Sequence, residues 1–170
     1  MTSRPLHAVL LPQRAAAGRL LDALGPAIDG TGPALLPLDP ALPRARLAEL
    51  IAAFSPDVIE TADGRRPGPG GPGGQPGAAG DVAVVLATSG TTGVPKGAEL
   101  TGAALLASAR ASLARLDGQA GRWLCCLPVH HISGLGVLVR SLVAGTTPVV
   151  TDRAGAADIA SAVALRPPCR

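Results

Sequence analysis

The sequence predicts an α/β fold in which strands and helices alternate and the strands run parallel. The continuous apolar run Val82–Ala87 has the length of a strand that is buried on both faces. The segment 101–116 then repeats apolar residues at helical spacing. Strand-like and helix-like segments also alternate on both sides of this pair, an order typical of layered α/β proteins.

The first part of the chain contains two helix patterns and two strand patterns. Prolines interrupt residues 33–43, so no regular element is expected there. In chain order the expected elements are a strand at 6–11, a helix at 15–24 that ends before Gly25-Pro26, a helix at 43–54 and a short strand at 57–59.

The second part of the chain begins with the apolar strand and continues the alternation. A loop at 88–97 follows the strand, and Thr101 is expected to cap the next helix. The later expected elements are a strand at 123–127, a helix at 135–144, a strand at 147–150 and a short helix at 156–164.

Glycine and proline concentrate in one segment, residues 65–80. Such a composition is typical of a surface linker. We therefore expect three parts: an α/β segment at 1–64, a Gly/Pro-rich linker at 65–80 and a second unit at 81–170.

Composition excludes several classes of function. The 15 basic and 12 acidic residues give a net charge of only +3, and with one Trp, one Phe and no Tyr the chain lacks the stacking side chains of nucleic-acid binders. No run approaches the ~18 apolar residues of a membrane span. Three cysteines, an odd number, favour a reducing, cytoplasmic setting.

The loop at 88–97 carries the clearest chemical signal. It combines glycines, four hydroxyl side chains and Lys96, the only lysine of the chain. Backbone N–H groups, hydroxyls and an ammonium group together suit a polyphosphate. Pro95 before Lys96 excludes a Walker A loop, and no G-x-S-x-G motif supports a hydrolase serine. The alternative is a plain turn with a surface lysine.

The run Ser89-Gly90-Thr91-Thr92-Gly93-Val94-Pro95-Lys96-Gly97 resembles the phosphate-loop signature of the adenylate-forming enzymes, the superfamily of acyl-CoA synthetases. Arg122–Leu124, Leu127–Leu135 and Val137–Thr146 look most like the o-succinylbenzoate:CoA ligases of menaquinone biosynthesis. The resemblance implies the N-terminal domain of that fold.

The same resemblance implies a reaction and its substrates. ATP with Mg²⁺ would be attacked by a carboxylate, pyrophosphate would leave, and coenzyme A would capture the acyl-adenylate. Holding the leaving phosphates is a positioning and electrostatic task. The residues implied to bind the nucleotide are Thr88, Ser89, Gly90, Thr91, Thr92, Gly93 and Lys96.

An acyl-substrate pocket is implied by the family spacing Pro-x-x-His-x-x-Gly, which selects His131 rather than His130, together with Ser133 and Gly134. A histidine pair that only fills a polar gap, and Ser133 as a helix N-cap, remain alternatives. Cys125 and Cys126 with the two histidines lack zinc-ligand spacing, so no metal site is expected.

Family features that normally follow are not found in this sequence, including the magnesium-holding acidic motif, the ribose-binding aspartate and the small C-terminal domain with its catalytic lysine. We therefore expect an N-terminal part without a complete catalytic set, inactive alone, whose partner could be a separate chain carrying the rest. The alternatives are a non-catalytic phosphate-loop-bearing remnant or binding module, and a ligase for another carboxylic acid.

Overall fold

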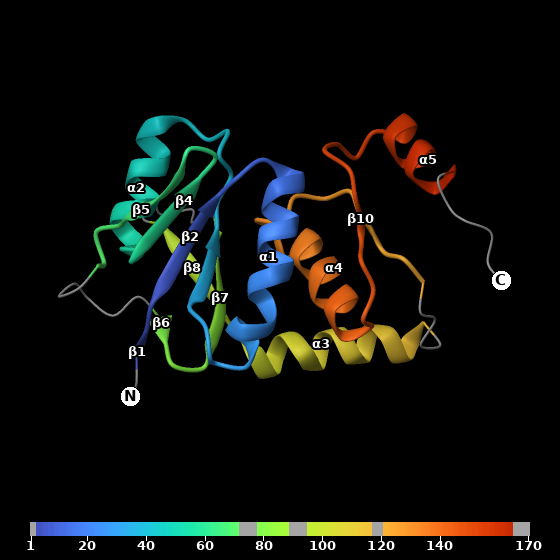
Figure 1. The fold of residues 1–170 in the computed structure, drawn as a ribbon, viewed down its shortest axis with the longest axis horizontal. Coiled ribbons are helices and arrows are strands. Elements are labelled where there is room, and N and C mark those ends of the chain that lie inside the picture. The colour runs from blue at the N-terminus through green and yellow to red at the C-terminus, as the bar shows by residue number, and fades with distance from the viewer. Residues whose placement is uncertain (1–2, 72–77, 89–94, 117–120, 165–170) are drawn as a thin grey trace.

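The computed structural model describes residues 3–71, 78–88, 95–116 and 121–164. One large sheet forms one side of the molecule, and helices α1 (Gln13–Ile28), α3 (Gly102–Arg115) and α4 (Ile132–Val143) pack together beside it (Figure 1). Helix α2 (Arg44–Phe54) covers the other face of the sheet, and α5 (Ala156–Ala164) lies at the opposite end of the molecule. The α/β fold class is thus confirmed.

The main sheet has six strands in the order β5-β4-β2-β3-β7-β8. Its four central strands are mutually parallel, as expected, whereas both edge strands are antiparallel to their neighbours. The strands are β2 (Leu6–Leu10), β3 (Ala34–Pro37), β4 (Val58–Thr61), β5 (Gly64–Pro67), β7 (Val82–Thr88) and β8 (Lys96–Thr101). Two small sheets pair β1 (Ser3–Arg4) with β6 (Ala78–Ala79), and β9 (Leu124–Cys125) with β10 (Val149–Val150).

The expectation of an all-parallel sheet is wrong at the edges because the connections there are short. Only Ala62 and Asp63 separate β4 from β5, which is a hairpin connection. The link from Thr88 to Lys96 is also shorter than the dozen or so residues that a parallel crossover needs. Strand β8 was not expected at all, because its mostly exposed residues leave no apolar run in the sequence.

Two further expectations are corrected in the first part of the chain. Strand β3 follows Pro33 and includes Pro37 as its last residue, yet all four of its residues are buried, and burial in the sheet outweighs the poor local propensity. Helix α1 also continues past Pro26 to Ile28. A proline in the last turn removes only one helical hydrogen bond, while Ala27 is fully buried against the core.

Most expected helices are confirmed. Thr101 caps α3, since its side-chain oxygen accepts a hydrogen bond from the Ala104 N–H at 3.1 Å. Helix α5 has the expected bounds, whereas α4 begins three residues earlier than expected, at Ile132. The N-cap of α4 is His131, so Ser133 is not the cap and lies inside the helix.

The apolar core has two parts, one on each face of the main sheet. One joins α1, α3 and α4 to residues such as Val9, Leu35 and Val84. The other joins α2 to Ala8, Leu36 and Val85. Strand β7 contributes to both, which confirms that its apolar run is buried on both faces.

The Gly/Pro segment is not a linker over its whole length. Residues 65–67 belong to strand β5, residues 78–79 form strand β6, and Gly70 is buried. The main sheet also takes strands from both sides of the segment, so a division into units at 1–64 and 81–170 runs through one sheet. Residues 72–77 lie outside the described residues, and a linker there remains a prediction.

None of the helices in the described part of the chain combines the length and the apolar character needed to cross a bilayer.

Candidate nucleotide and substrate site

The candidate site lies where the central parallel strands end. The loop after β2 leads into α1 on one face of the sheet, and the loop after β3 leads into α2 on the other. Adjacent loops that depart to opposite faces leave a crevice outside the carboxyl ends of the strands, where open α/β sheets bind their ligands. Strand β7 ends at the same edge with Thr88.

Two adjoining cavities occupy this edge. The larger, about 510 Å³, extends from Gln13 to Cys126 and Arg153. The smaller, about 180 Å³, contains Thr88 and His131. They share four lining residues, namely Pro37, Leu38, Asp39 and His130. Asp39 and His130 therefore form the polar part of the wall between them.

The structure brings the two ends of the phosphate-loop motif together. Thr88 and Lys96 face each other in the antiparallel pair of β7 and β8, and the Thr88 hydroxyl donates to the Lys96 carbonyl at 3.1 Å. Both residues are exposed. Ser89, Gly90, Thr91, Thr92 and Gly93 lie outside the described residues.

The histidine pair stands directly before helix α4. The rings of His130 and His131 lie 4.5 Å apart between centroids, tilted by 56°. His130 is half-buried, with its Nε2 atom 3.9 Å from the Asp39 carboxylate, whereas His131 is exposed. Burial lowers the pKa of His130, His131 adds to this, and Asp39 opposes it. His130 is thus favoured in its neutral form, between Asp39 and His131.

Gln13, in the first turn of α1, holds the chain segment that precedes this pair. Its side-chain amide donates to the Leu127 carbonyl at 2.9 Å and accepts from the Val129 N–H at 3.1 Å. The amide nitrogen and the amide oxygen of Gln13 therefore both form hydrogen bonds with a segment that lies more than 110 residues away in the sequence.

The three expected acyl-pocket residues are separated by the fold. His131 faces the small cavity with Thr88, while Ser133 lines a different cavity of about 330 Å³ between α3 and α4. Gly134 is buried and contacts no described cavity. A Cβ atom there would lie 2.3 Å from the Pro128 carbonyl oxygen, so glycine permits the close approach of α4 to the preceding turn.

Arg140 is a polar residue of the α3–α4 cavity that the sequence pattern did not single out. Its guanidinium carbon lies 4.6 Å from the Trp123 ring centroid, a cation–π contact. Its Nε atom is buried without a hydrogen-bond partner among the described residues, and burial lowers its pKa. A guanidinium beside Ser133 in a mostly apolar cavity suits a carboxylate.

The adjacent cysteines are free thiols, and Cys125 is buried. Burial raises the pKa of Cys125 to about 11, and its thiol lies 3.7 Å from the Gly134 carbonyl. Cys125 is therefore a packing residue rather than a nucleophile. Within the described ranges, no cluster of His, Cys, Asp and Glu side chains could hold a metal ion.

Sequence reasoning missed Gln13, Asp39 and Arg140 and assigned no role to His130. A usable signal existed for the first two, because each is among the first polar residues after an apolar strand whose carboxyl end faces the site. Arg140 gave no such signal, since its neighbours are brought together only by helix packing.

Comparison with known proteins identifies the family. Residues 62–166 match the family model described as AMP-binding enzyme. A probable 2-succinylbenzoate–CoA ligase from Mycobacterium tuberculosis is 56% identical over 79 residues, which are 46% of this chain and 20% of the relative. The 2-succinylbenzoate–CoA ligase of Escherichia coli is 32% identical over 130 residues, which are 70% of this chain and 29% of the relative.

A solved structure extends the likeness to almost the whole chain. The o-succinylbenzoate coenzyme A synthetase of Bacillus subtilis, in complex with ATP and magnesium ion, matches with a TM-score of 0.71 and 21% identity over 96% of this chain and 48% of that one. The chain thus spans less than half the length of the proteins it matches, and it shares the fold of their N-terminal domain. The family match covers more than half of the chain, and on this ground the chain belongs to the AMP-binding enzyme family.

Proposed function

We propose that the chain provides the phosphate-binding side and part of the acyl pocket of an ATP-dependent acid–CoA ligase acting on 2-succinylbenzoate. The observation that carries this proposal is the pairing of Thr88 with Lys96 at the carboxyl edge of the sheet, beside the cavity that contains His131. The relatives named above, which are acid–CoA ligases, support the same reaction class.

In the proposed reaction, Mg²⁺–ATP is held by the loop between Thr88 and Lys96. The Lys96 ammonium group and the loop donors stabilise charge on the β- and γ-phosphates while the substrate carboxylate attacks the α-phosphorus and pyrophosphate leaves. The magnesium ion arrives with the nucleotide. The thiol of coenzyme A then attacks the acyl carbon of the adenylate and loses its proton, and the bond to AMP breaks, so the products are the acyl-CoA thioester and AMP.

The α3–α4 cavity supports the choice of acyl substrate. A succinylbenzoate has two carboxylates and an aromatic ring, so one carboxylate can be activated while the other needs a cationic partner. Arg140 and Ser133 offer that partner within walls formed by residues such as Leu105 and Val139. An acid with one carboxylate would offer no pairing group to Arg140, whose Nε atom is buried without a hydrogen-bond partner among the described residues.

A second candidate function is a non-catalytic module that binds a polyphosphate. The pairing of Thr88 with Lys96 supports it as well, because this pairing bears on phosphate binding and not on turnover. The two candidates share the phosphate site and differ in turnover.

The test begins with binding of Mg²⁺–ATP to the purified chain by calorimetry. Lys96→Ala should weaken binding about tenfold, equivalent to ~1.4 kcal/mol. Arg110→Ala is the matched control, since it removes an exposed positive charge from α3, away from the site. Equal binding by the Lys96 variant and the control would exclude the phosphate role.

Turnover distinguishes the two candidates. The chain is incubated with Mg²⁺–ATP, 2-succinylbenzoate and coenzyme A, and pyrophosphate release is followed. We expect no release from this chain alone, because groups on one side of a cleft cannot supply the full transition-state stabilisation. A polypeptide with the remaining family motifs should restore release in the ligase and leave a binding module inactive.

A further inference from the structure

We propose that Gln13 is a positioning residue that fixes the histidine segment at the carboxyl edge of the sheet. Its amide bridges the Leu127 carbonyl at 2.9 Å and the Val129 N–H at 3.1 Å, and Val129 directly precedes His130. The inference rests on the proposed function in one respect, namely that His131 serves a bound substrate.

The backbone needs this support because its strand has already ended. Strand β9 stops at Cys125, and Pro128 has no N–H to continue a ladder. Val129 is only 2% exposed, so its N–H has no access to water and must find a partner within the protein. Gln13 provides it and at the same time satisfies a carbonyl on the other side of Pro128.

The side-chain amide is suited to this task because it both donates and accepts. A carboxylate of the same length can accept from Val129 but cannot donate to Leu127, and an apolar side chain of the same length can do neither. The position is also well supported, because Gln13 lies in the first turn of a 16-residue helix whose later turns are buried in the core.

A second contact reaches the same segment from the loop after β3. Asp39 of this loop lies 3.9 Å from His130. Gln13 and Asp39 both line the larger cavity. The histidine segment is therefore contacted from the start of α1 through its backbone and from the β3–α2 loop through the His130 imidazole.

The test uses ring NMR signals of the histidines in the intact chain, without nucleotide. The sequence has three histidines, and His7 on β2 serves as an internal reference. The variants are Gln13→Met, which loses both hydrogen bonds, and Gln13→Glu, which loses one and places a negative charge favourably at a helix N-terminus. Arg14→Ala, at the neighbouring exposed position, is the matched control.

We expect the His130 and His131 signals to shift in both Gln13 variants, more for Met than for Glu, with His7 unchanged. The titration midpoint of His130 should rise toward the ordinary value of ~6.5 as the segment loosens. The Arg14 control should match the original chain.

Three outcomes would overturn the proposal. These are unchanged His130 and His131 signals in both variants, equal shifts of all three histidines, and loss of the folded state in both variants, which would make Gln13 a requirement for folding instead. Failure of the proposed function can be distinguished from failure of this proposal. The histidine signals are measured without nucleotide, so they report on the role of Gln13 whether or not the chain binds Mg²⁺–ATP.

Discussion

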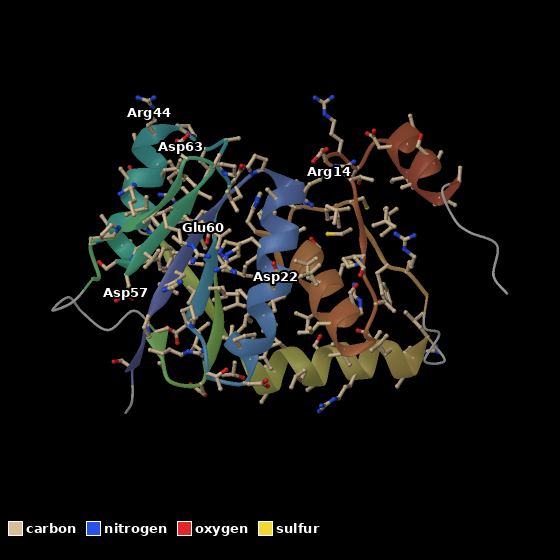
Figure 2. The ribbon with its side chains drawn as sticks, viewed as in Figure 1. Arg14, Asp22, Arg44, Asp57, Glu60 and Asp63 are labelled. Carbon is tan, nitrogen blue, oxygen red and sulfur yellow. The ribbon has the colours of Figure 1, made fainter. Side chains whose placement is uncertain are left out.

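The six-stranded sheet and the region formed by β9, β10 and α5 are held together in different ways. Strand β7 is buried from Val82 to Leu86, with helices on both faces of its sheet, whereas α5 has no buried residue. Glu60 lies on β4 of the sheet (Figure 2). Its salt bridge with Arg19 of α1 joins side chains that are only 15% and 22% exposed. Its counterpart from Arg14 to Asp152 joins side chains that are 67% and 61% exposed.

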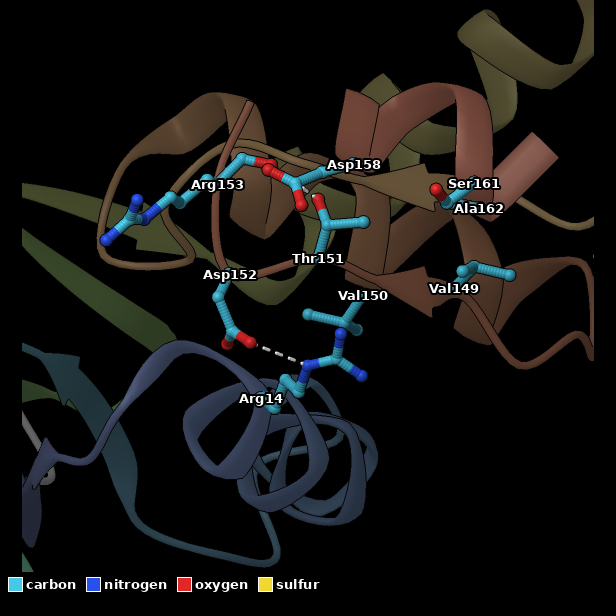
Figure 3. Close-up of a pocket in the computed structure, with 9 residues that line it drawn as sticks. All are labelled: Arg14, Val149, Val150, Thr151, Asp152, Arg153, Asp158, Ser161 and Ala162. Carbon is cyan, nitrogen blue, oxygen red and sulfur yellow. Dashed lines mark hydrogen bonds and ion pairs between the residues drawn. The ribbon is translucent and has the colours of Figure 1, made fainter. Parts of the chain in front are cut away.

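The second region also surrounds an open pocket of about 460 Å³, lined by Arg14 of α1, the residues of β10 and Asp158 of α5 (Figure 3). An exposed ion pair contributes little to stability. The buried contacts that stabilise the chain therefore lie mainly in the main sheet and in helices α1, α2, α3 and α4, and the histidine segment lies at the junction between the two regions.

The largest expected effect comes from opening the packed region. Leu138→Ala removes a fully buried side chain from α4 and should lower the free energy of unfolding by about 2–5 kcal/mol. Urea denaturation measures this. Leu142→Ala on the same helix is the control, because Leu142 is 36% exposed, and an equal loss in both variants would contradict the comparison.

The next effect concerns the junction itself. Gly134→Ala should destabilise the chain by about 1–3 kcal/mol, because the new methyl group would meet the backbone carbonyls of Leu127 and Pro128. Gly136→Ala is the matched control in the same helix. There the nearest atom is the end of the Arg140 side chain at 3.3 Å, so the higher helix propensity of alanine should leave stability unchanged or raised.

A smaller effect is expected from pH. Burial lowers the pKa of His7, with Arg19 and Arg65 adding to this and Asp57 and Glu60 opposing it, and burial likewise lowers the pKa of His130. Both histidines then bind protons more readily in the unfolded chain than in the folded one. The free energy of unfolding should therefore be highest above the unfolded histidine pKa of ~6.5 and should fall as the pH drops toward the lower pKa values of the folded state. Urea midpoints from pH 8 to 5 measure it.

The two histidines separate the regions in this experiment, since His7 lies in the main sheet and His130 at the junction. His7→Asn and His130→Asn should each flatten part of the pH dependence. If neither variant changes the slope of stability against pH, the pH dependence comes from other titrating groups.

The smallest effect is expected at α5. Val163→Ser changes a side chain that is 50% exposed on a helix without buried residues, so the free energy of unfolding should change by less than about 0.5 kcal/mol. Thermal unfolding followed by circular dichroism is sufficient to measure it. A loss comparable with that of Leu138→Ala would show that α5 is part of the same cooperative unit.

Local patterns were sufficient for the elements that carry their own signal. The apolar run of β7, the Thr101 cap and the bounds of α5 follow from residue spacing and short-range chemistry. The link between the phosphate-loop motif and a strand end was likewise visible, because the motif directly follows the apolar run.

The antiparallel edge strands depend on less visible signals. Strand β5 begins at Gly64 of an Asp63-Gly64 pair, a dipeptide typical of hairpins, and Gly64 has a φ of +121°, yet the residues of the strand are exposed. Strand β8 pairs with β7 over six residues without an apolar pattern. Their positions come from pairing with a buried neighbour.

The sequence by itself determined the α/β class, the family and the place of the phosphate-loop motif, because these depend on residues that are adjacent along the chain. Only the tertiary structure decided that Gln13 and Asp39 contact the histidine segment, that Ser133 lies with Arg140 in a cavity apart from His131, and that the main sheet is mixed. These contacts join residues far apart in sequence, and their geometry is fixed by how the helices pack on the sheet.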